Sequence, residues 1–526
     1  MEELSQKLFR LRDGELQKLI PLGLILLSNS LAIQNSYIAS VSGFLSQVGI
    51  NKFIAVSCIS YFLLLIIMAI QSLVIDRFDR ITLMRRTTIA FMGTFIFLRL
   101  LFWLQCPSWI NYSLFYLITE VQWLVYPLVF WIFANNLFTL AEGKRIFPLL
   151  GGWGLTGKLM GIGISTLAPN LFKAFNIQPE ELITVNVIFY GIALVCLSAQ
   201  SLKPIIRNTN RVRNTTRISK GKNIKQLTED IFTDVETEEV VQQSLSTSDR
   251  LHRLREFNVQ SLHTKLNTLS APVQSEPVKA SPPKEKRFKM ITIQEINDTY
   301  LPGFNFVKNV PSFYYLAFSL LGLSICDAIV EFRFLAVSGQ VFIDPDRYQV
   351  FYGLYRLSLT LLGLVIQIFF SGHVIEKIGL KNTFLIMPIA TLSGLLWCLV
   401  DPGLASSFGT ILLFRLSWDT IDESSRKSFQ SLIPEDLRGR VSLFIDGYLP
   451  ALGNAIGFGL VGVVVLLGIW TGFQFYFYGY LVLGFLASLT ALISIWKMRE
   501  IYDQSLLNWR LTRRKRAKSI LDDFNF

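Results

Sequence analysis

Residues 53–75 read FIAVSCISYFLLLIIMAIQSLVI, a run without a single charged side chain. An α-helix of about 20 apolar residues is long enough to cross the hydrocarbon core of a bilayer. The whole chain has a matching composition, because 51% of its residues are hydrophobic and 17% are charged, whereas soluble domains carry about 25% charged residues. The stretch therefore predicts one membrane-spanning helix of a membrane protein.

Similar apolar runs recur along the 526 residues, spaced by roughly 30 residues, which corresponds to one span and a short loop. In the first half they cover about 17–44, 53–75, 87–106, 113–138, 147–168 and 182–201, and in the second half about 311–336, 348–371, 382–401, 404–428, 441–470 and 473–497. We expect an all-α membrane protein with twelve transmembrane helices in two six-helix bundles.

The loops after spans 2, 4, 8 and 10 are basic, and the alternate loops at 107–112, 402–403 and 471–472 carry no positive charge. Lys52, Lys173 and Arg347 are the exceptions to this alternation. Cytoplasmic loops are enriched in Lys and Arg. The pattern predicts a multi-pass protein of the plasma or inner membrane with both termini in the cytoplasm, so the net charge of +12 reports on topology and predicts no nucleic-acid partner.

Residues 202–309 differ from the apolar runs around them. Their start is basic, their middle is acidic and their end contains several prolines, a composition typical of a disordered linker. We expect residues 1–201 to form the first bundle, 202–309 a largely disordered cytoplasmic linker, 310–498 the second bundle and 499–526 a basic cytoplasmic tail. The tail sequence RLTRRKRAK at 510–518 suits the anionic lipids of the bilayer.

A short motif recurs in the two halves. Residues 72–81 read SLVIDRFDRI and residues 372–381 read GHVIEKIGLK, so each half places an acid and then a base at the same position between an even and an odd span. This resembles the loop signature of the major facilitator superfamily, G-x-x-x-D-R-x-G-R-[KR]. Transporters of this kind are built from repeated helical units. We predict that Asp76 with Arg77, and Glu376 with Lys377, brace a cytoplasmic gate.

Several ionisable side chains lie inside the predicted spans, where they are costly and usually face the interior of the bundle. They are Arg99, Glu120, Lys158, Asp327, Glu331, Arg333, Arg356, Arg415, Asp419 and Asp446. Asp327 and Glu331 are one helical turn apart, and so are Arg415 and Asp419. Each charge is open to two interpretations, a polar translocation path or an ion pair that holds helices together, and Arg99 and Asp446 favour the second.

Residues 152–158 read GWGLTGK, which satisfies two phosphate-binding patterns. No strand precedes the run and Leu159 follows it, so we interpret it as part of a helix. We expect Gly157, Gly161, Gly453 and Gly457 to permit close helix packing. The cysteines show no metal-binding spacing. We therefore predict no cofactor, no metal site and no enzyme activity.

The stretch 119–151, TEVQWLVYPLVFWIFANNLFTLAEGKRIFPLLG, resembles the nucleotide transporter family of plastid and bacterial ATP:ADP antiporters. That family has a Glu followed by Leu-Trp, then F-W-x-F-A-N, E-A-K-R and P-L-x-G. Further matches are Val330-Glu331, the residues Tyr348, Phe351 and Gly353, and the stretches 426–434 and 438–446. The family's first span carries a cationic cluster for phosphates, whereas residues 32–37 here read AIQNSY.

The resemblance implies a monomeric secondary transporter that works in the bilayer by alternating access, moving an anionic or nucleotide-like small molecule such as ATP or ADP. Alternatives are a proton-coupled major-facilitator carrier of another small solute, in which Asp327 and Glu331 relay protons, and a transport-inactive membrane scaffold. Candidate solute contacts are Glu120, Asn135, Lys158, Glu331, Arg333, Arg356, Arg415 and Asp419; candidate gating and coupling residues are Asp76, Arg77, Asp327, Glu376 and Lys377.

Overall fold

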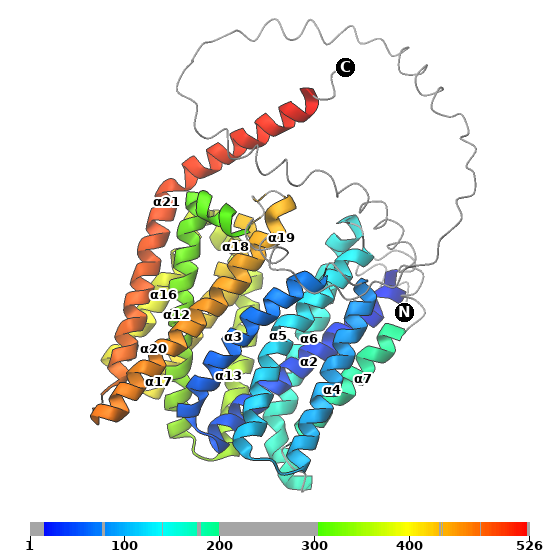
Figure 1. Cartoon of the computed structure of the whole chain (residues 1–526), viewed down its shortest axis with the longest axis vertical. Coiled ribbons are helices and arrows are strands. Elements are labelled where there is room, and N and C mark those ends of the chain that lie inside the picture. The colour runs from blue at the N-terminus through cyan, green and yellow to red at the C-terminus, as the bar shows by residue number, and fades with distance from the viewer. Residues whose placement is uncertain are drawn as a thin grey trace, which may run out of the picture. The chain divides into compact units, whose positions relative to one another are not determined.

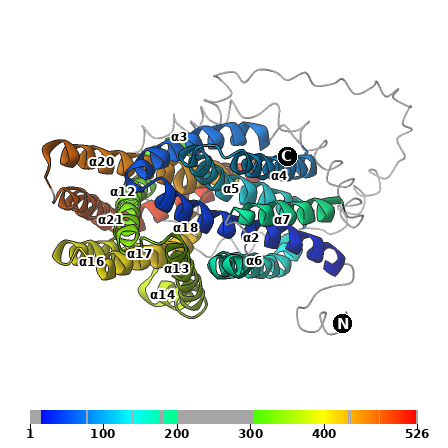
Figure 2. The ribbon, with the colours of Figure 1, turned by 90° about the horizontal axis from the view of Figure 1, so that it is seen from below.

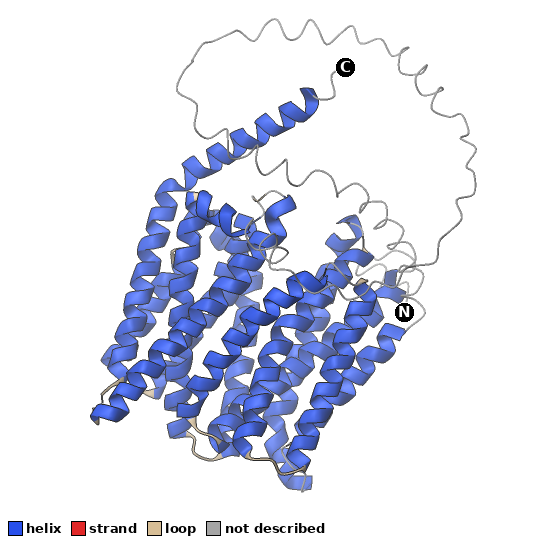
Figure 3. Ribbon diagram, viewed as in Figure 1, coloured by secondary structure: helices blue, strands red, loops and turns tan. Residues whose placement is uncertain are grey.

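The computed structural model describes residues 15–75, 79–138, 140–175, 180–198, 303–430, 433, 435–473 and 475–522. The secondary structure of this part of the chain is helical, without a strand (Figure 3). By its contacts the chain divides into one unit of Met1–Asn210 with Thr292–Phe526 and a second unit, Arg211–Ile291, which falls outside the described residues.

Six helices form the first half of the described bundle. They are α2 (Glu15–Gln47), α3 (Ile50–Ile75), α4 (Arg80–Trp103), α5 (Ser108–Leu137), α6 (Leu140–Phe175) and α7 (Glu181–Ser198). They run alternately up and down in Figure 1, so α2 begins and α7 ends on the same side. We call this the terminal side and the other the opposite side.

The second half repeats this order with interrupted helices. It consists of α12 (Pro311–Val341); α13 (Pro345–Ile366), η2 (Gln367–Ser371) and α14 (Gly372–Ile378); α15 (Leu380–Thr383) and α16 (Ile386–Val400); α17 (Leu404–Leu416), η3 (Ser417–Asp422) and α18 (Glu423–Gln430); α19 (Glu435–Leu443), η4 (Phe444–Tyr448) and α20 (Leu449–Thr471); and α21 (Phe477–Asp522). The elements η2, η3 and η4 are π-helical turns, which are frequent at functional sites.

The twelve predicted spans correspond to these segments, and the predicted fold class is confirmed. Ten of the described helices are long and apolar enough to cross a membrane. The remaining two segments are α6, which is rich in glycine and carries Lys158, and α17–η3–α18, which carries Arg415 and Asp419. Their polar residues lower the hydropathy of two helices that contribute to the centre of the protein.

Glycines bring the first helix of each half against the fifth, and this prediction is confirmed. A Cβ on Gly157 would lie 2.2 Å from the backbone oxygen of Leu27, and one on Gly161 would lie 2.4 Å from that of Leu31, so α6 touches the backbone of α2. Gly453 and Gly457 do the same for α20 against α12, with Cβ distances of 2.5 and 2.7 Å to side chains of that helix. Such small-residue contacts are typical of membrane helix packing.

The two halves meet through symmetric pairs of helices. The second helix of the first half, α3, packs on the fifth of the second half, α20, while α6 packs on α13. Phe53 and Tyr61 surround Phe458 on one flank, with ring centroids 6.2 and 5.8 Å away. The helices of each half gather on their own side of this interface (Figure 2). The contact between halves is the place where residues of both can form one site.

Residues 303–309, which we assigned to the linker, are helical. Val307 is buried there in a cluster with Phe313 of α12. The rest of the predicted linker, 202–302, lies outside the described residues, and its disorder remains a prediction. The final helix α21 continues beyond the predicted span to Asp522 and includes most of the basic tail.

Candidate functional site

A partly buried arginine joins two buried carboxylates at the centre of the second half. Nη2 of Arg415 on α17 lies 3.0 Å from Oδ1 of Asp327 and 3.0 Å from Oε2 of Glu331, both on α12. Asp327 and Glu331 are each 6% exposed, so the pair of acids depends on this one guanidinium for its counter-charge. Removing one partner of a buried ion pair leaves an uncompensated charge. We call Asp327, Glu331 and Arg415 the triad, and we infer that its ion pairs persist in this arrangement of the helices.

The first half reaches this triad through a tyrosine. The hydroxyl of Tyr37 on α2 donates a hydrogen bond of 3.0 Å to Oε1 of Glu331. The Tyr37 ring stacks on Tyr352 of α13, with centroids 6.3 Å apart and an interplanar angle of 22°. One uncharged residue thus connects α2 with both α12 and α13.

Arg356 on α13 crosses the same interface in the other direction. Its Nη2 donates to Oε1 of Gln34 on α2 across 2.9 Å, and its guanidinium lies 4.6 Å from the centre of the Tyr37 ring. Its Nε has no hydrogen-bond partner in the described structure. An amide and an aromatic ring are thus its partners, and no carboxylate among the described residues forms an ion pair with Arg356.

Lys158 on α6 is a second cation that forms no ion pair among the described residues. Arg356 and Asp419 are the charged groups close enough to act on it, but within the described residues no carboxylate forms an ion pair with it. Asp419 lies in η3 and is exposed. Two cations, one from each half, are thus close together without a bound carboxylate.

Glu120 lies at the middle of α5, where it is 8% exposed. Tyr116, one turn earlier on the helix, and Glu331 of α12 are close enough to interact with its carboxyl group. Glu120 forms no ion pair in the part of the chain that the structure describes.

A cavity of about 10 Å³ lies between Tyr37, Arg356 and the Glu331–Arg415 pair, which is about the space that one water molecule needs. Lys158 and Glu120 are not among its walls. Its walls are Tyr37, Glu331, Phe334, Leu335, Tyr352, Tyr355, Arg356, Ile411 and Arg415, from α2, α12, α13 and α17. A larger solute requires the two halves to move apart before it can contact these side chains.

Of the predicted solute contacts, Glu331, Arg356 and Arg415 line the cavity, whereas Arg333 and Asn135 lie away from it. Arg333 is directed to the opposite side of the second half, where it donates to the backbone oxygen of Pro402 and stacks 4.5 Å over the Phe477 ring. Asn135 is exposed, fifteen residues beyond Glu120, which corresponds to about 22 Å along a helix. Neither side chain reaches the cavity.

The predicted gate residues are only partly described. Asp76 and Arg77 lie outside the described residues. Glu376 and Lys377 lie on α14 and are exposed, and the described structure gives neither an ion pair. Their gating role therefore remains a prediction.

A network of amides and hydroxyls next to the site was not predicted. Asn35 on α2 donates to Oδ1 of Asn186 on α7 across 2.8 Å and accepts from Ser165 on α6 across 2.7 Å. The backbone oxygen of Ser165 accepts a 2.8 Å hydrogen bond from Gln349 of α13. Four helices from both halves are linked by neutral groups, whose only signal in the sequence is a polar run inside the apolar span 17–44.

On the opposite side the halves are joined by an exposed ion pair. Nζ of Lys173, at the end of α6, lies 2.5 Å from Oδ2 of Asp346 at the start of α13. This hydrogen bond and the carboxylate charge raise the pKa of the Lys173 ammonium. The pair is exposed, so it contributes little to stability, but it marks the α6–α13 contact on the side opposite the termini.

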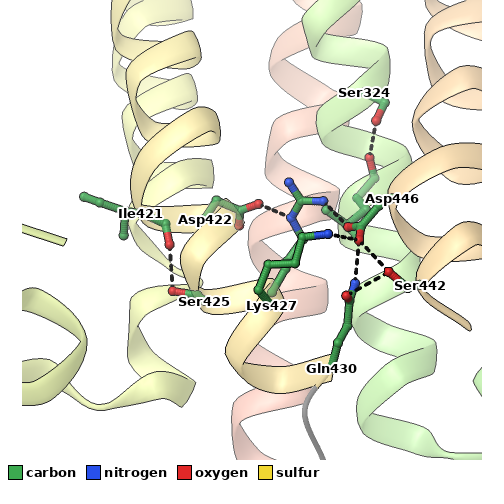
Figure 4. Close-up of polar contacts among 10 residues, drawn as sticks. Ser324, Ile421, Asp422, Ser425, Lys427, Gln430, Ser442 and Asp446 are labelled. Atoms are coloured by element: carbon green, nitrogen blue, oxygen red, sulfur yellow. Dashed lines mark hydrogen bonds and ion pairs between the residues drawn. The ribbon is translucent and has the colours of Figure 1, made fainter. Parts of the chain in front are cut away.

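A second charged cluster braces the terminal side of the second half (Figure 4). Arg426 on α18 donates to Asp422 across 2.7 Å and to Asp446 of η4 across 2.6 Å. Asp446 also accepts from Lys427, Gln430 and Ser442 at 2.7, 2.8 and 3.1 Å. As the sequence favoured, Asp446 holds helices together, and it does so between two π-helical turns. Arg99 likewise pairs with Glu181 of α7.

Part of the chain is similar to proteins of a known family. Residues 41–237 match the model of the TLC ATP/ADP transporter family. The ADP,ATP carrier protein 4 of Rickettsia felis is 45% identical over 58 residues, which are 11% of this chain and 11% of that protein. The protein of the same name from Rickettsia conorii is 47% identical over 49 residues, 9% of each chain. The chain thus aligns with about a tenth of the length of these curated relatives.

Solved structures show the same fold over nearly the whole chain. The nucleoside transporter NupG has a TM-score of 0.52 at 12% identity, covering 91% of this chain and 99% of that protein. A peptide transporter, POT, has a TM-score of 0.51 at 9% identity, covering 92% and 95%. The predicted helical fold is therefore shared with these transporters, and the predicted resemblance to ATP:ADP transporters is confirmed for residues 41–237.

Proposed function

We infer that this chain, whose residues 41–237 match the model of the TLC ATP/ADP transporter family, is a secondary transporter that moves an anionic, nucleotide-like solute by alternating access. The curated relatives are named ADP,ATP carriers, and one structural neighbour is a nucleoside transporter. These names point to nucleotides as the first solutes to test. We further propose that both termini face the cytoplasm.

One observation carries the proposal. Lys158 of α6 and Arg356 of α13 come from different halves, lie near each other, and have no carboxylate partner among the described residues. Arg415, in contrast, already forms ion pairs with Asp327 and Glu331. Unpaired cations at membrane depth are costly, and a phosphate group would supply the missing negative charge with short, charge-assisted hydrogen bonds.

The same two cations suggest how binding drives movement. A phosphate group held by Lys158 and Arg356 at once would bind both halves, and it would do so best when the halves are close. A ligand shifts a conformational equilibrium by its difference in affinity for the two states. The solute would therefore favour the occluded state between the two open states. Glu331 and Arg415 would lie beside the bound solute, and Asp419 would lie on the terminal side of it.

The remaining predicted residues do not contact the solute in this proposal. Arg333 and Asn135 lie away from the cavity, so we do not assign them a solute contact. Asp76, Arg77, Glu376 and Lys377 would act as gate residues on the terminal side.

Calorimetric titration of the purified protein in detergent tests the solute class. ATP, ADP, tripolyphosphate and adenosine would be titrated separately. We expect ATP and ADP to bind, tripolyphosphate to bind more weakly because it lacks the nucleoside, and adenosine to bind most weakly because it offers no charge to Lys158 and Arg356. Absence of binding by both ATP and ADP would exclude nucleotides as the solute.

A further inference from the structure

Glu120 is a carboxylic acid without a counter-ion in the middle of a membrane-spanning helix. It is 8% exposed, and among the described residues no lysine or arginine forms an ion pair with it. An ionised carboxylate buried without a counter-charge is unfavourable, and such groups take up a proton instead. The anion-binding arrangement proposed above assigns no role to Glu120.

The groups that surround Glu120 reinforce this state. Tyr116 of its own helix, Tyr61 of α3 and Tyr37 of α2 lie near it, and their phenol groups supply no positive charge. Across the interface, Glu331 of α12 is close enough for its charge to interact, and a second negative charge there would repel an ionised Glu120. The like charge of Glu331 therefore favours the protonated carboxyl.

The nearest cations are already engaged. Arg415 of α17 forms its ion pairs with Asp327 and Glu331. Arg356 of α13 donates its hydrogen bond to Gln34. The helix α4 also packs on α5, but its Arg99 pairs with Glu181. In this closed arrangement, no cation among the described residues forms an ion pair that would stabilise an ionised Glu120.

We propose that Glu120 binds a proton that is carried together with the solute, so that transport is coupled to a proton gradient. The inference rests on the proposed function, because it assigns a second substrate to the same site. A proton from water on one side forms the O–H bond of the Glu120 carboxyl before the halves close. After they open to the other side, water reaches the carboxyl, the O–H bond breaks, and the proton leaves with that water.

The exchange of labelled ATP into liposomes loaded with ADP tests the coupling. For the unchanged protein, we expect an imposed pH gradient to change the initial uptake rate several-fold. For Glu120→Gln, the amide cannot release a proton, so whatever exchange it retains should be the same with and without the gradient. Glu181→Gln is the matched control, because Glu181 pairs with Arg99, and it should keep the response to pH.

A response to the gradient that survives in Glu120→Gln would overturn the proposal, and so would an unchanged protein that ignores the gradient. If the unchanged protein exchanges no nucleotide at all, the proposed function fails first. In that case, infrared spectroscopy at neutral pH still tests whether Glu120 is protonated, because this measurement does not require transport. The proposal predicts a band of a protonated carboxylic acid that is lost in Glu120→Gln and kept in Glu181→Gln. An ionised Glu120 would refute it.

Discussion

The Tyr37 hydroxyl donates a 3.0 Å hydrogen bond to Oε1 of Glu331, and this bond joins the first helix of one half to the first helix of the other. Because Oε2 of Glu331 binds Arg415, both oxygens of one carboxylate are engaged, one within its half and one across the interface. Any movement that separates the halves at this level must break the Tyr37 bond. The bond therefore favours the closed arrangement of the centre.

Tyr37→Phe should shift the protein toward states in which the halves are separated on the opposite side. A hydrogen bond to a charged group contributes about 1.5–3 kcal/mol. Spin labels on Trp109→Cys and Ile343→Cys, two exposed positions in different halves, would report the separation in a cysteine-free background. We expect an additional population at longer distance.

Tyr352→Phe provides the control for this measurement. Tyr352 stacks on Tyr37 but does not bond Glu331, so removal of its hydroxyl should leave the distance distribution as it is. Identical distributions for Tyr37→Phe and its parent would show that the bond does not hold the halves together.

Arg415→Gln should be strongly destabilising. It leaves Asp327 and Glu331 buried without their shared counter-ion, and removing one partner of a buried ion pair typically costs about 3–5 kcal/mol. Thermal unfolding of the purified protein would show this as a large drop of the midpoint. Lys173→Gln removes an exposed ion pair that contributes about 0–1 kcal/mol, and its midpoint should stay near that of the parent. Equal midpoints for all three proteins would refute the role given to Arg415.

Gly157→Ala should also destabilise the protein, through packing instead of charge. Its Cβ would lie 2.2 Å from a backbone oxygen of α2, whereas a Cβ on Gly163 of the same helix meets nothing within 4 Å. Overpacking costs about 1–3 kcal/mol. The comparison of unfolding midpoints for Gly157→Ala and Gly163→Ala isolates this contact, and a tolerated Gly157→Ala would mean that the two helices can move apart without loss.

The twelve spans and the glycine contacts could be predicted because both are local signals. A bilayer requires long apolar runs, and G-x-x-x-G spacing repeats in residues 157–161 and 453–457. Such features are visible in one helix without knowing its neighbours. The π-helical turns of the second half left no comparable pattern, since they depend on how helices such as α18 and η4 are held to each other.

The sequence could show which charged residues belong to the centre, but not which of them pair with each other. Ionisable residues stand out in apolar spans, so Glu120, Lys158 and Arg415 were recognised, yet the sequence could not say that Arg333 points to Pro402 and not into the cavity. Tyr37 and Gln34 were missed as site residues because they carry no charge. Their roles arise from partners more than 290 residues away in the chain.

Lys158→Gln and Arg356→Gln should each weaken nucleotide binding. A charged hydrogen bond contributes about 1.5–3 kcal/mol, and about 1.4 kcal/mol corresponds to tenfold in affinity, so we expect roughly 10- to 100-fold losses in calorimetric titrations with ATP. Lys381→Gln removes a positive charge that pairs with Asp503, away from the cavity, and should bind ATP normally. Equal affinities for all four proteins would place the nucleotide elsewhere.

Counter-exchange in liposomes tests the central claim most directly. Purified protein is reconstituted in liposomes with or without internal ADP, and the initial uptake of labelled ATP is measured against protein-free liposomes. A nucleotide transporter that works by alternating access predicts uptake that internal ADP accelerates and that Lys158→Gln with Arg356→Gln reduces. Uptake that is the same with ADP, without ADP and without protein would contradict the account.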